Sequence, residues 1–198
     1  TSCPTKGRPI PISCTSGSAT VTIKSSNMSE TAKYRHLTAP YLKGCGVDIG
    51  TGGYEPVVPH AISVELPAPQ FAWYTQNRKA EFPIHLDCGA LDLPFKDGSL
   101  GFVYSSHLIE DFLDWFPALR EWTRVVKVGG NIVILFPDKK LWGEALARGQ
   151  PPNCEHRHES CVGEMSEHFR HFPNFSILVD SLTALTPEDY TIMFVATR

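Results

Sequence analysis

The chain has 198 residues, is 42% apolar and 20% charged, and carries a formal net charge of −3. This size and composition predict one globular domain with a hydrophobic core. The near-neutral charge argues against a protein that binds nucleic acid or a membrane surface through its charge. Because no apolar run reaches the roughly 18–20 residues that span a bilayer, and no signal peptide is evident, we expect a cytoplasmic protein.

Residues 1–28 differ in composition from the rest of the chain. Eleven of the first 27 residues are Ser or Thr, three are Pro and none is aromatic. Such a stretch buries little apolar surface, so we expect a flexible or non-native N-terminal extension, followed by a domain over residues 29–198. The six cysteines are too few for a disulfide scaffold, and we expect most of them, including Cys45 and Cys88, to be free thiols.

The domain begins with a short helix signal at Ser29–Ala32 and continues with five apolar strand candidates. Each candidate ends near Gly, Ser, Pro or Asp, as strands that lead into functional loops do. The five candidates cover residues 46–49, 61–66, 82–86, 100–105 and 131–136.

A helix is predicted between the fourth and fifth strands. Trp115, Leu119, Trp122 and Val126 recur at spacings of 4, 3 and 4, which places them on one helix face. Asp114 can cap the start of this helix, and the Gly pair at 129–130 can end it in a left-handed turn. A strand, a crossover helix and a strand predict a parallel pair.

The C-terminal part holds an amphipathic stretch at 163–169 and two further strand candidates at 175–179 and 190–196. A turn signal at 186–189 separates these strands, so we expect an antiparallel hairpin. Alternating strands and helices that end in a hairpin predict a three-layer α/β domain.

A glycine loop, Gly50-Thr51-Gly52-Gly53, follows the first strand, and Asp48 lies inside that strand. Glycines at the carboxyl edge of a parallel sheet allow the backbone to approach a ligand, although a simple tight turn has the same composition. Glu65 ends the second strand, 17 residues after Asp48. A carboxylate there can accept two hydrogen bonds from a ribose diol, or it can be a solvated edge residue.

Two cofactor classes use this arrangement. A nicotinamide dinucleotide needs a helix N-terminus after the glycines for its pyrophosphate, but residues 54–60 include Pro56 and Pro59, which disfavour a helix. The glycines also miss the G-x-G-x-x-G spacing. A ligand with a ribose and no pyrophosphate, such as S-adenosylmethionine, fits better.

Further stretches complete the pattern in order over about residues 33–138. They are Val47–Gly53, Ile62–Glu65, the Leu-Pro-Phe-Lys-Asp-Gly-Ser-Leu block at 93–100, residues 102–110 with Ser-Ser-His-x-x-Glu, and Leu119–Pro137 with Arg-Val-Val-Lys-Val-Gly-Gly at 124–130. This combination resembles class I S-adenosylmethionine-dependent methyltransferases, most closely the type 11 group. The resemblance implies a Rossmann-like fold with a mostly parallel seven-stranded sheet that ends in an antiparallel hairpin.

The resemblance also implies which residues bind S-adenosylmethionine. The glycine loop and Asp48 would line the methionine and ribose end, Glu65 would hold the ribose hydroxyls, and Leu66 would lie against the adenine. Residues at the ends of the next strands would complete the site: Asp87 (or Asp92) and Cys88 at the adenine, and Ser105, Ser106 and His107 as the floor below the methyl group.

Two residues before the first strand, Tyr34 and Arg35, would close over the cofactor. The fork of Arg35 can pair with the methionine carboxylate, although an exposed Arg with no ligand is an alternative.

Methyl transfer asks the protein to align a nucleophile and to remove a proton from a hydroxyl or amine acceptor. The candidate bases are His107, Asp138, His156 and His158. His107 can instead bond only to backbone, and Asp138 can instead cap the following helix.

The loop at 154–161 contains two Cys and two His, which can ligate zinc, line the acceptor pocket or lie in solvent. The spacing is not that of a zinc finger, so we expect no metal.

We expect an enzyme that transfers a methyl group from S-adenosylmethionine to a small molecule, with sugar and lipid precursors among the candidate acceptors. The alternatives are a non-catalytic S-adenosylmethionine-binding or partner protein of the same fold and an NAD-dependent oxidoreductase.

Overall fold

The computed structural model describes residues 29–66, 85–150, 152–153, 155–158, 160–183, 185–186 and 189–198, with only the backbone of Asp87. The extension expected at 1–28 and most of the third predicted strand lie outside these residues. The helices are α1 (Glu30–Thr38), α3 (Phe116–Val125), α4 (Lys139–Ala147) and α5 (Glu164–Phe169), with two 3-10 helices, η1 (Ala39–Tyr41) and η3 (Ile109–Asp111). The strands are β1 (Gly46–Ile49), β2 (Ala61–Glu65), β3 (Leu86–Asp87), β4 (Leu100–Ser106), β5 (Val126–Pro137), β6 (Ser176–Leu182) and β7 (Thr191–Thr197).

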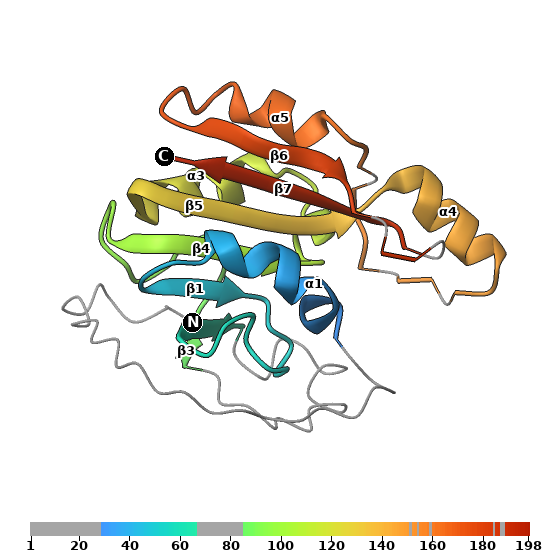
Figure 1. The fold of residues 1–198 in the computed structure, drawn as a ribbon, viewed down its shortest axis with the longest axis horizontal. Coiled ribbons are helices and arrows are strands. Elements are labelled where there is room, and N and C mark those ends of the chain that lie inside the picture. Colours follow the sequence, from blue (N-terminus) through green and yellow to red (C-terminus); the bar gives the residue numbers. More distant parts are fainter. Residues whose placement is uncertain are drawn as a thin grey trace.

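Within the described residues the strands form one seven-stranded sheet in the order β3-β2-β1-β4-β5-β7-β6. The first five strands run parallel, and β7 is antiparallel to both β5 and β6. The expected mostly parallel sheet with a closing antiparallel hairpin is therefore confirmed. The carboxyl ends of the parallel strands meet at the edge next to α4 (Figure 1).

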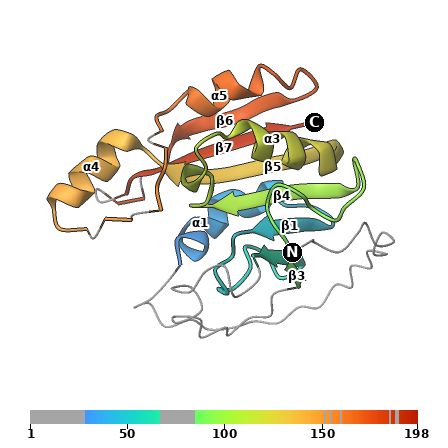
Figure 2. The same cartoon turned by 180° about the vertical axis from the view of Figure 1, so that it is seen from behind.

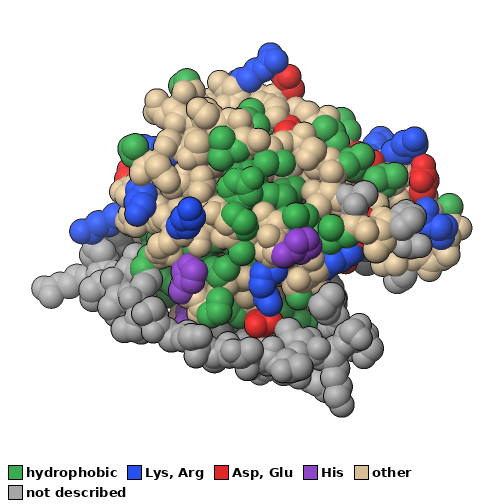
Figure 3. All heavy atoms as spheres, in the orientation of Figure 1, with side chains coloured by type: hydrophobic (Ala, Val, Ile, Leu, Met, Phe, Trp, Pro, Cys, Tyr) green, Lys and Arg blue, Asp and Glu red, His purple; other side chains and the backbone are tan. Residues whose placement is uncertain are grey.

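Helices cover the two faces of this sheet unequally. On one face α1 lies in front of β1 and β4 (Figure 1), where Tyr34 packs with Val57, Val58, Phe102 and Tyr104. Figure 3 shows apolar side chains gathered on this face over β5, β7 and β6. On the other face α3 and α5 pack against the sheet (Figure 2). This gives the predicted three layers.

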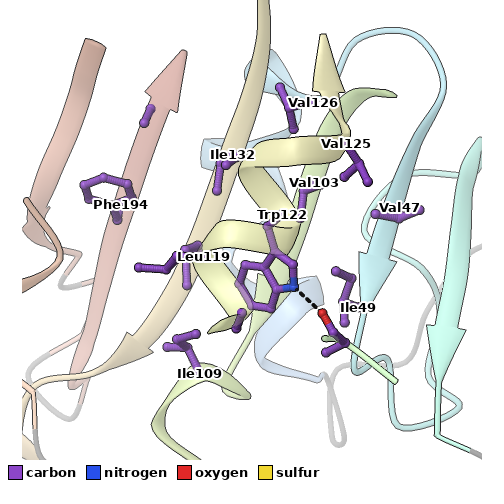
Figure 4. Close-up of a cluster of buried hydrophobic side chains, with 14 of the residues drawn as sticks. Val47, Ile49, Val103, Ile109, Leu119, Trp122, Val125, Val126, Ile132 and Phe194 are labelled. Atoms are coloured by element: carbon purple, nitrogen blue, oxygen red, sulfur yellow. Dashed lines mark hydrogen bonds between the residues drawn. The ribbon is translucent and has the colours of Figure 1, made fainter. Parts of the chain in front are cut away.

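The predicted apolar stripe of the central helix lies against the second face. Leu119 and Trp122 are fully buried, and Figure 4 shows Trp122 pointing from α3 toward the strands. Its indole Nε1–H donates a 2.9 Å hydrogen bond to the carbonyl of Ala90, which satisfies the polar end of a large buried side chain. The cap residue of α3 is Trp115 and not the predicted Asp114, and Trp115 makes no side-chain capping bond. Asp114, one residue earlier, accepts a hydrogen bond from the N–H of Phe116, the first residue of the helix.

The C-terminal limit of this helix was predicted wrongly. The helix ends at Val125, and the chain enters β5 directly at Val126, which pairs with Leu100 of β4. Gly129 has a φ of +74°, but it lies in the irregular first part of β5 and does not cap the helix. The β-branched residues at 125 and 126 favour an extended chain, and pairing with β4 decides where the helix stops.

Arg124, near the end of α3, fastens the loop that joins β3 to β4. Its guanidinium donates to the carbonyls of Leu93 and Phe95 at 3.1 and 2.8 Å and to the Asp97 carboxylate at 2.6 Å. Glu121, one turn earlier, accepts two hydrogen bonds from Arg124 and one from the N–H of Leu93. These bonds explain physically why the 93–100 block and the Arg at 124 occur together in the sequence.

One cysteine among the described residues departs from expectation. Cys45 is disulfide-bonded, so the expectation that it is a free thiol was wrong. Cys88 and Cys161 are thiols. Pairing depends on which cysteines the fold brings within bonding distance, and composition does not report that distance.

No helix in the described part of the chain has the length and apolar character required to cross a bilayer.

Candidate functional site

The glycine loop follows β1 at the carboxyl edge of the sheet. Gly50, Gly52 and Gly53 have φ values of +77°, +61° and +79°, a region that favours glycine. A Cβ atom on Gly50 would lie 2.9 Å from Cδ2 of Leu108, so a side chain there would also require Leu108 to shift. The Thr51 hydroxyl accepts from the N–H of Gly53 at 3.4 Å and belongs to the internal bonding of the loop.

Two carboxylates from β1 and β2 bind the glycine loop and the segment that follows it. Glu65, the last residue of β2, accepts from the N–H groups of Gly52 and Leu66 at 2.8 and 2.9 Å. Asp48, in β1, is buried and accepts from the N–H of Val57 at 2.7 Å. Glu65 therefore lies beside the glycine loop, as a ribose-binding residue at this position would.

The segment between the glycine loop and β2 contains no helix, as its prolines predict. Arg35, on α1, holds this segment instead. Its Nε donates to the Val57 carbonyl at 2.8 Å, and its Nη2 contacts the Glu55 carboxylate at 3.0 Å and the Pro56 carbonyl at 3.2 Å. In this structure the Arg35 fork faces the loop. Its assignment to a cofactor carboxylate stays a prediction.

The ends of β3 and β4 complete the same edge. Asp87 pairs in register with Glu65, and the N–H of Cys88 donates to the Glu65 carbonyl at 3.0 Å. Asp92, the alternative to Asp87, is exposed. The buried Ser105 hydroxyl donates to the Ile49 carbonyl of β1 at 3.2 Å, and Ser106 ends β4.

A cluster of ionisable side chains follows β4. His107 has a φ of 52°, and its N–H donates to the Leu135 carbonyl of β5 at 2.8 Å. Its Nδ1 lies 3.3 Å from the Glu110 carboxylate, and the same carboxylate oxygen lies 3.6 Å from Nε2 of His156. Glu110 is completely buried. Two of the four candidate bases therefore meet at one carboxylate.

Sequence reasoning did not assign a role to Glu110. The signal that could have found it is its position three residues after His107, because residues spaced i, i+3 come together in a helical turn. The turn is η3, and the Glu110 carbonyl also accepts the N–H groups of Arg157 and His158 at 2.8 and 3.0 Å. These bonds bring the loop after α4 to the cluster.

The other two candidate bases are bound elsewhere. Asp138 caps α4, with its carboxylate accepting from the N–H of Leu141 at 3.0 Å. His158 lies 2.6 Å from the Glu164 carboxylate, and its ring packs 4.4 Å from that of Trp115.

The structure describes three of the four candidate zinc ligands. Cys154 lies outside the described residues, while His156 and His158 face different carboxylates. Among the described residues, no group of three His, Cys, Asp or Glu side chains is arranged to hold a metal ion.

Aromatic side chains border the histidine cluster. Trp142 of α4 lies 5.1 Å from the His156 ring and 4.9 Å from the Tyr190 ring, and Tyr190 lies 5.9 Å from the His107 ring. Tyr34 is fully buried against the sheet.

Burial and neighbouring charges shift the titration of this edge. Burial raises the pKa of Asp48 to about 7, against the hydrogen bond from Val57. Burial, followed by repulsion from Glu110 and Glu155, raises the pKa of Asp111 to about 7. Burial lowers the pKa of His107, but the Glu110 carboxylate outweighs this effect and the net pKa is raised. Burial lowers the pKa of His156. The edge thus holds groups that titrate near neutral pH, as catalytic sites often do.

Comparisons with known proteins agree with this architecture. Residues 43–134 match the family model of a methyltransferase domain, type 11. A search of the curated proteins gave no match.

Three of the solved structures that match this chain illustrate the shared fold. A S-adenosylmethionine-dependent methyltransferase from Thermotoga maritima, described as a possible histamine N-methyltransferase, is 20% identical over 84% of this chain and 88% of its own, with a TM-score of 0.59. One from Archaeoglobus fulgidus is 15% identical over 85% and 92%, with a TM-score of 0.61. A chain in the complex formed by the Trm112 methyltransferase activator of Haloferax volcanii is 20% identical over 84% and 88%, with a TM-score of 0.57. At these identities the structures show a common fold.

The family match, the strand order and the glycine loop agree with one another. The chain is thus similar to class I S-adenosylmethionine-dependent methyltransferases of the type 11 group, and S-adenosylmethionine is the cofactor that this similarity indicates.

Proposed function

We propose that the chain transfers a methyl group from S-adenosylmethionine to a small-molecule acceptor by in-line displacement. The observation that carries this proposal is the shared position of two sets of residues. The glycine loop with Glu65 and the cluster of His107, Glu110 and His156 lie at the same carboxyl edge of the sheet. In open α/β sheets this edge is where ligands bind.

The residues around the glycine loop fit the proposed cofactor. Three glycines with positive φ leave room for a ligand against the backbone, and Glu65 offers a carboxylate suited to ribose hydroxyls. No helix follows the loop, so the pyrophosphate site of a nicotinamide dinucleotide is missing from the described residues. Residues that would hold the cofactor are Asp48, Gly50–Gly53, Glu65, Leu66, Asp87, Cys88, Ser105 and Ser106. When bound, the cofactor supplies an electrophilic methyl group on a sulfonium.

The chain's own side chains must perform the other functions that methyl transfer requires. They must hold the acceptor in line with the methyl group, which lowers the barrier through proximity, and they must accept a proton from a hydroxyl or amine. His107 and His156 stand at the carboxyl end of β4 and in the loop beside it. Trp142 and Tyr190 offer aromatic faces on which an acceptor can pack.

The acceptor is proposed to be small because the part of the chain available to bind it is short. The segment between β5 and β6 consists of α4, α5 and connecting loops. A sugar or lipid precursor is compatible with a site that combines aromatic rings and carboxylates.

A second candidate function is a non-catalytic S-adenosylmethionine-binding or partner protein of the same fold. Two side chains expected on the cofactor, Arg35 and Glu65, already bind the loop here. The Haloferax volcanii structure, a complex with an activator protein, is an example of a protein of this fold that binds a protein partner.

Isothermal titration calorimetry separates these candidates. We expect S-adenosylmethionine and S-adenosylhomocysteine to bind in the micromolar range and NAD not to bind. Replacing Glu65 by Ala should weaken binding at least tenfold, because the ribose hydroxyls lose their acceptor; one decade corresponds to about 1.4 kcal/mol. Glu167→Ala, on the exposed side of α5, is the matched control and should bind as the parent does.

Absence of binding to a folded chain would contradict the proposal. Binding without release of S-adenosylhomocysteine on any acceptor in a broad screen would favour the non-catalytic candidate.

A further inference from the structure

Glu110 deepens the proposed function, on which this inference rests. Its carboxylate is completely buried, at the end of a turn that places it below His107. A buried carboxylate without a compensating cation is strongly destabilising. Among the described residues, the ionisable nitrogens in ion-pair distance of this carboxylate belong to the imidazoles of His107 and His156, at 3.3 and 3.6 Å from one oxygen.

The two imidazoles stand in different environments. Both ring nitrogens of His107 are engaged, Nδ1 by Glu110 at 3.3 Å and Nε2 by the Thr191 hydroxyl at 3.2 Å. Its backbone is also fixed by the bond to Leu135. His107 therefore has no ring nitrogen left to accept a proton from a substrate.

His156 has one nitrogen toward Glu110 and one nitrogen to spare. Its Nε2 faces the carboxylate, and within the described residues no hydrogen bond is made by Nδ1. The ring lies against Trp142 of α4. The contact to Glu110, at 3.6 Å, is an ion-pair contact longer than a hydrogen bond. A carboxylate that faces one nitrogen of an imidazole favours the proton on that nitrogen, so that the other nitrogen carries the lone pair, as in an oriented general base.

We propose that Glu110 is a positioning residue that fixes His107 as a structural partner and orients His156 as the base for the acceptor. In the reaction, the proton of the acceptor's O–H or N–H moves to Nδ1 of His156. The electron pair on that oxygen or nitrogen forms the bond to the methyl carbon, and the pair of the broken S–CH3 bond returns to sulfur, which becomes neutral.

The charges around the two rings agree with this division. The groups around His107 come from three elements: Glu110 and Asp111 of η3, Thr191 of β7 with Tyr190 just before it, and Glu30 and Lys33 of α1. Glu110 raises the pKa of His107 although burial opposes it.

His156 faces Glu110, His107 and Trp142. Burial lowers the pKa of His156, the Glu110 charge opposes this effect, the charge on His107 adds to it, and the net pKa is lowered. The two pKa values are thus shifted in opposite directions, so His107 binds its proton more tightly than His156 does, and only a neutral ring can accept a proton.

The test is a histidine titration by NMR on the full chain, with ring resonances assigned by single replacement of each His. In the parent protein we expect His107 to titrate at higher pH than His156, and neutral His156 to carry its proton on Nε2. In Glu110→Gln, which keeps the size of the side chain, the pKa of His107 should fall by about one pH unit or more, since a nearby opposite charge shifts a pKa by this amount.

Glu164→Gln is the matched control, because Glu164 contacts His158 in the same way at 2.6 Å. It should leave the titrations of His107 and His156 unchanged. The inference is overturned if His156 titrates above His107 in the parent protein. It is also overturned if folded Glu110→Gln leaves the His107 titration unchanged. If Glu110→Gln does not fold, the order in which His107 and His156 titrate in the parent protein still tests the inference.

This result can be separated from the proposed function. Glu110 and His156 make no contact with Glu65 or the glycine loop among the described interactions, so Glu110→Gln and His156→Gln should bind S-adenosylmethionine within about twofold of the parent. Failure of the parent to bind S-adenosylmethionine would remove the proposed function, and the histidine titration would still report on Glu110.

Discussion

At the scale of single residues, side chains hold the glycine loop and the segment after it, which contains no helix. The N–H groups of Gly52 and Val57 are bound by Glu65 and Asp48, and the carbonyls of Pro56 and Val57 are bound by Arg35. Backbone groups near a buried edge need partners, and without a helix these must come from side chains. The loop is therefore ordered by three charged residues.

Asp48 gives this loop a pH dependence. Its pKa is raised to about 7 from 3.8 by burial, so the folded chain keeps a proton that the unfolded chain releases between about pH 4 and 7. The contribution of Asp48 to stability is complete below about pH 4 and is lost as the pH rises to 7. One pKa unit corresponds to about 1.4 kcal/mol, so the loss is of the order of a few kcal/mol.

We expect Asp48→Asn to remove this dependence while its amide oxygen still accepts from Val57. Urea unfolding of both proteins from pH 4.5 to 7.5 measures it. The variant should lose less stability than the parent across this range. A parent and a variant with parallel curves would show that Asp48 is ionised in the folded chain at acidic pH.

At the scale of elements, α3 is the part that organises the second half of the domain. Its buried face supports the sheet through Leu119 and Trp122, and its last turn holds the loop before β4 through Arg124. The helix therefore sets the position of β4, whose carboxyl end leads directly to His107.

Arg124→Lys tests this fastening. Lys keeps the charge but cannot donate in several directions from a planar fork, so the bonds to Leu93 and Phe95 should be lost. Since Arg124 is partly exposed, we expect a loss of about 1–2 kcal/mol in the free energy of unfolding. Urea denaturation measures it.

The control is Arg170→Lys, because Arg170 is an exposed partner of Glu167. This change should alter stability by less than about 0.5 kcal/mol. Equal stability of the two variants would contradict a structural role for the Arg124 bonds.

The sequence predicted those elements whose cause is local. The apolar runs of β1, β2 and β4 and the stripe of α3 follow from residue spacing, and the prolines at 56 and 59 predicted the missing helix. The end of α3 was missed because it depends on pairing between Val126 and Leu100, which are distant in sequence. Glu110 was missed for the same reason, since its second partner, His156, arrives from a loop 46 residues later.

At the scale of the whole molecule, α1 connects the two ends of the candidate site. Arg35 binds the loop beside the glycines, whereas Lys33 forms an ion pair with Asp189, just before β7. Asp189 in turn accepts from the N–H groups of Leu185 and Thr186. The N-terminal helix thus joins the proposed cofactor end to the β6–β7 hairpin, and a ligand at this edge should stabilise the domain as one unit.

Ligand-linked unfolding measures this coupling. A ligand that binds only the folded chain adds RT ln(1 + [L]/Kd), which is about 2.7 kcal/mol at a hundred times Kd. For a domain of this size one kcal/mol raises the melting temperature by about 2–4 °C, so S-adenosylmethionine at that concentration should raise it by roughly 5–11 °C. NAD at the same concentration is the control and should leave the melting temperature unchanged.

The sharper comparison is between the gain in unfolding free energy in urea and the gain calculated from the calorimetric Kd. Agreement between the two values would show that the domain unfolds and releases its ligand in one cooperative step. A gain well below the calculated value would mean that the glycine loop opens, and releases its ligand, before the sheet unfolds, and that the contacts made by α1 do not join the two ends of the site.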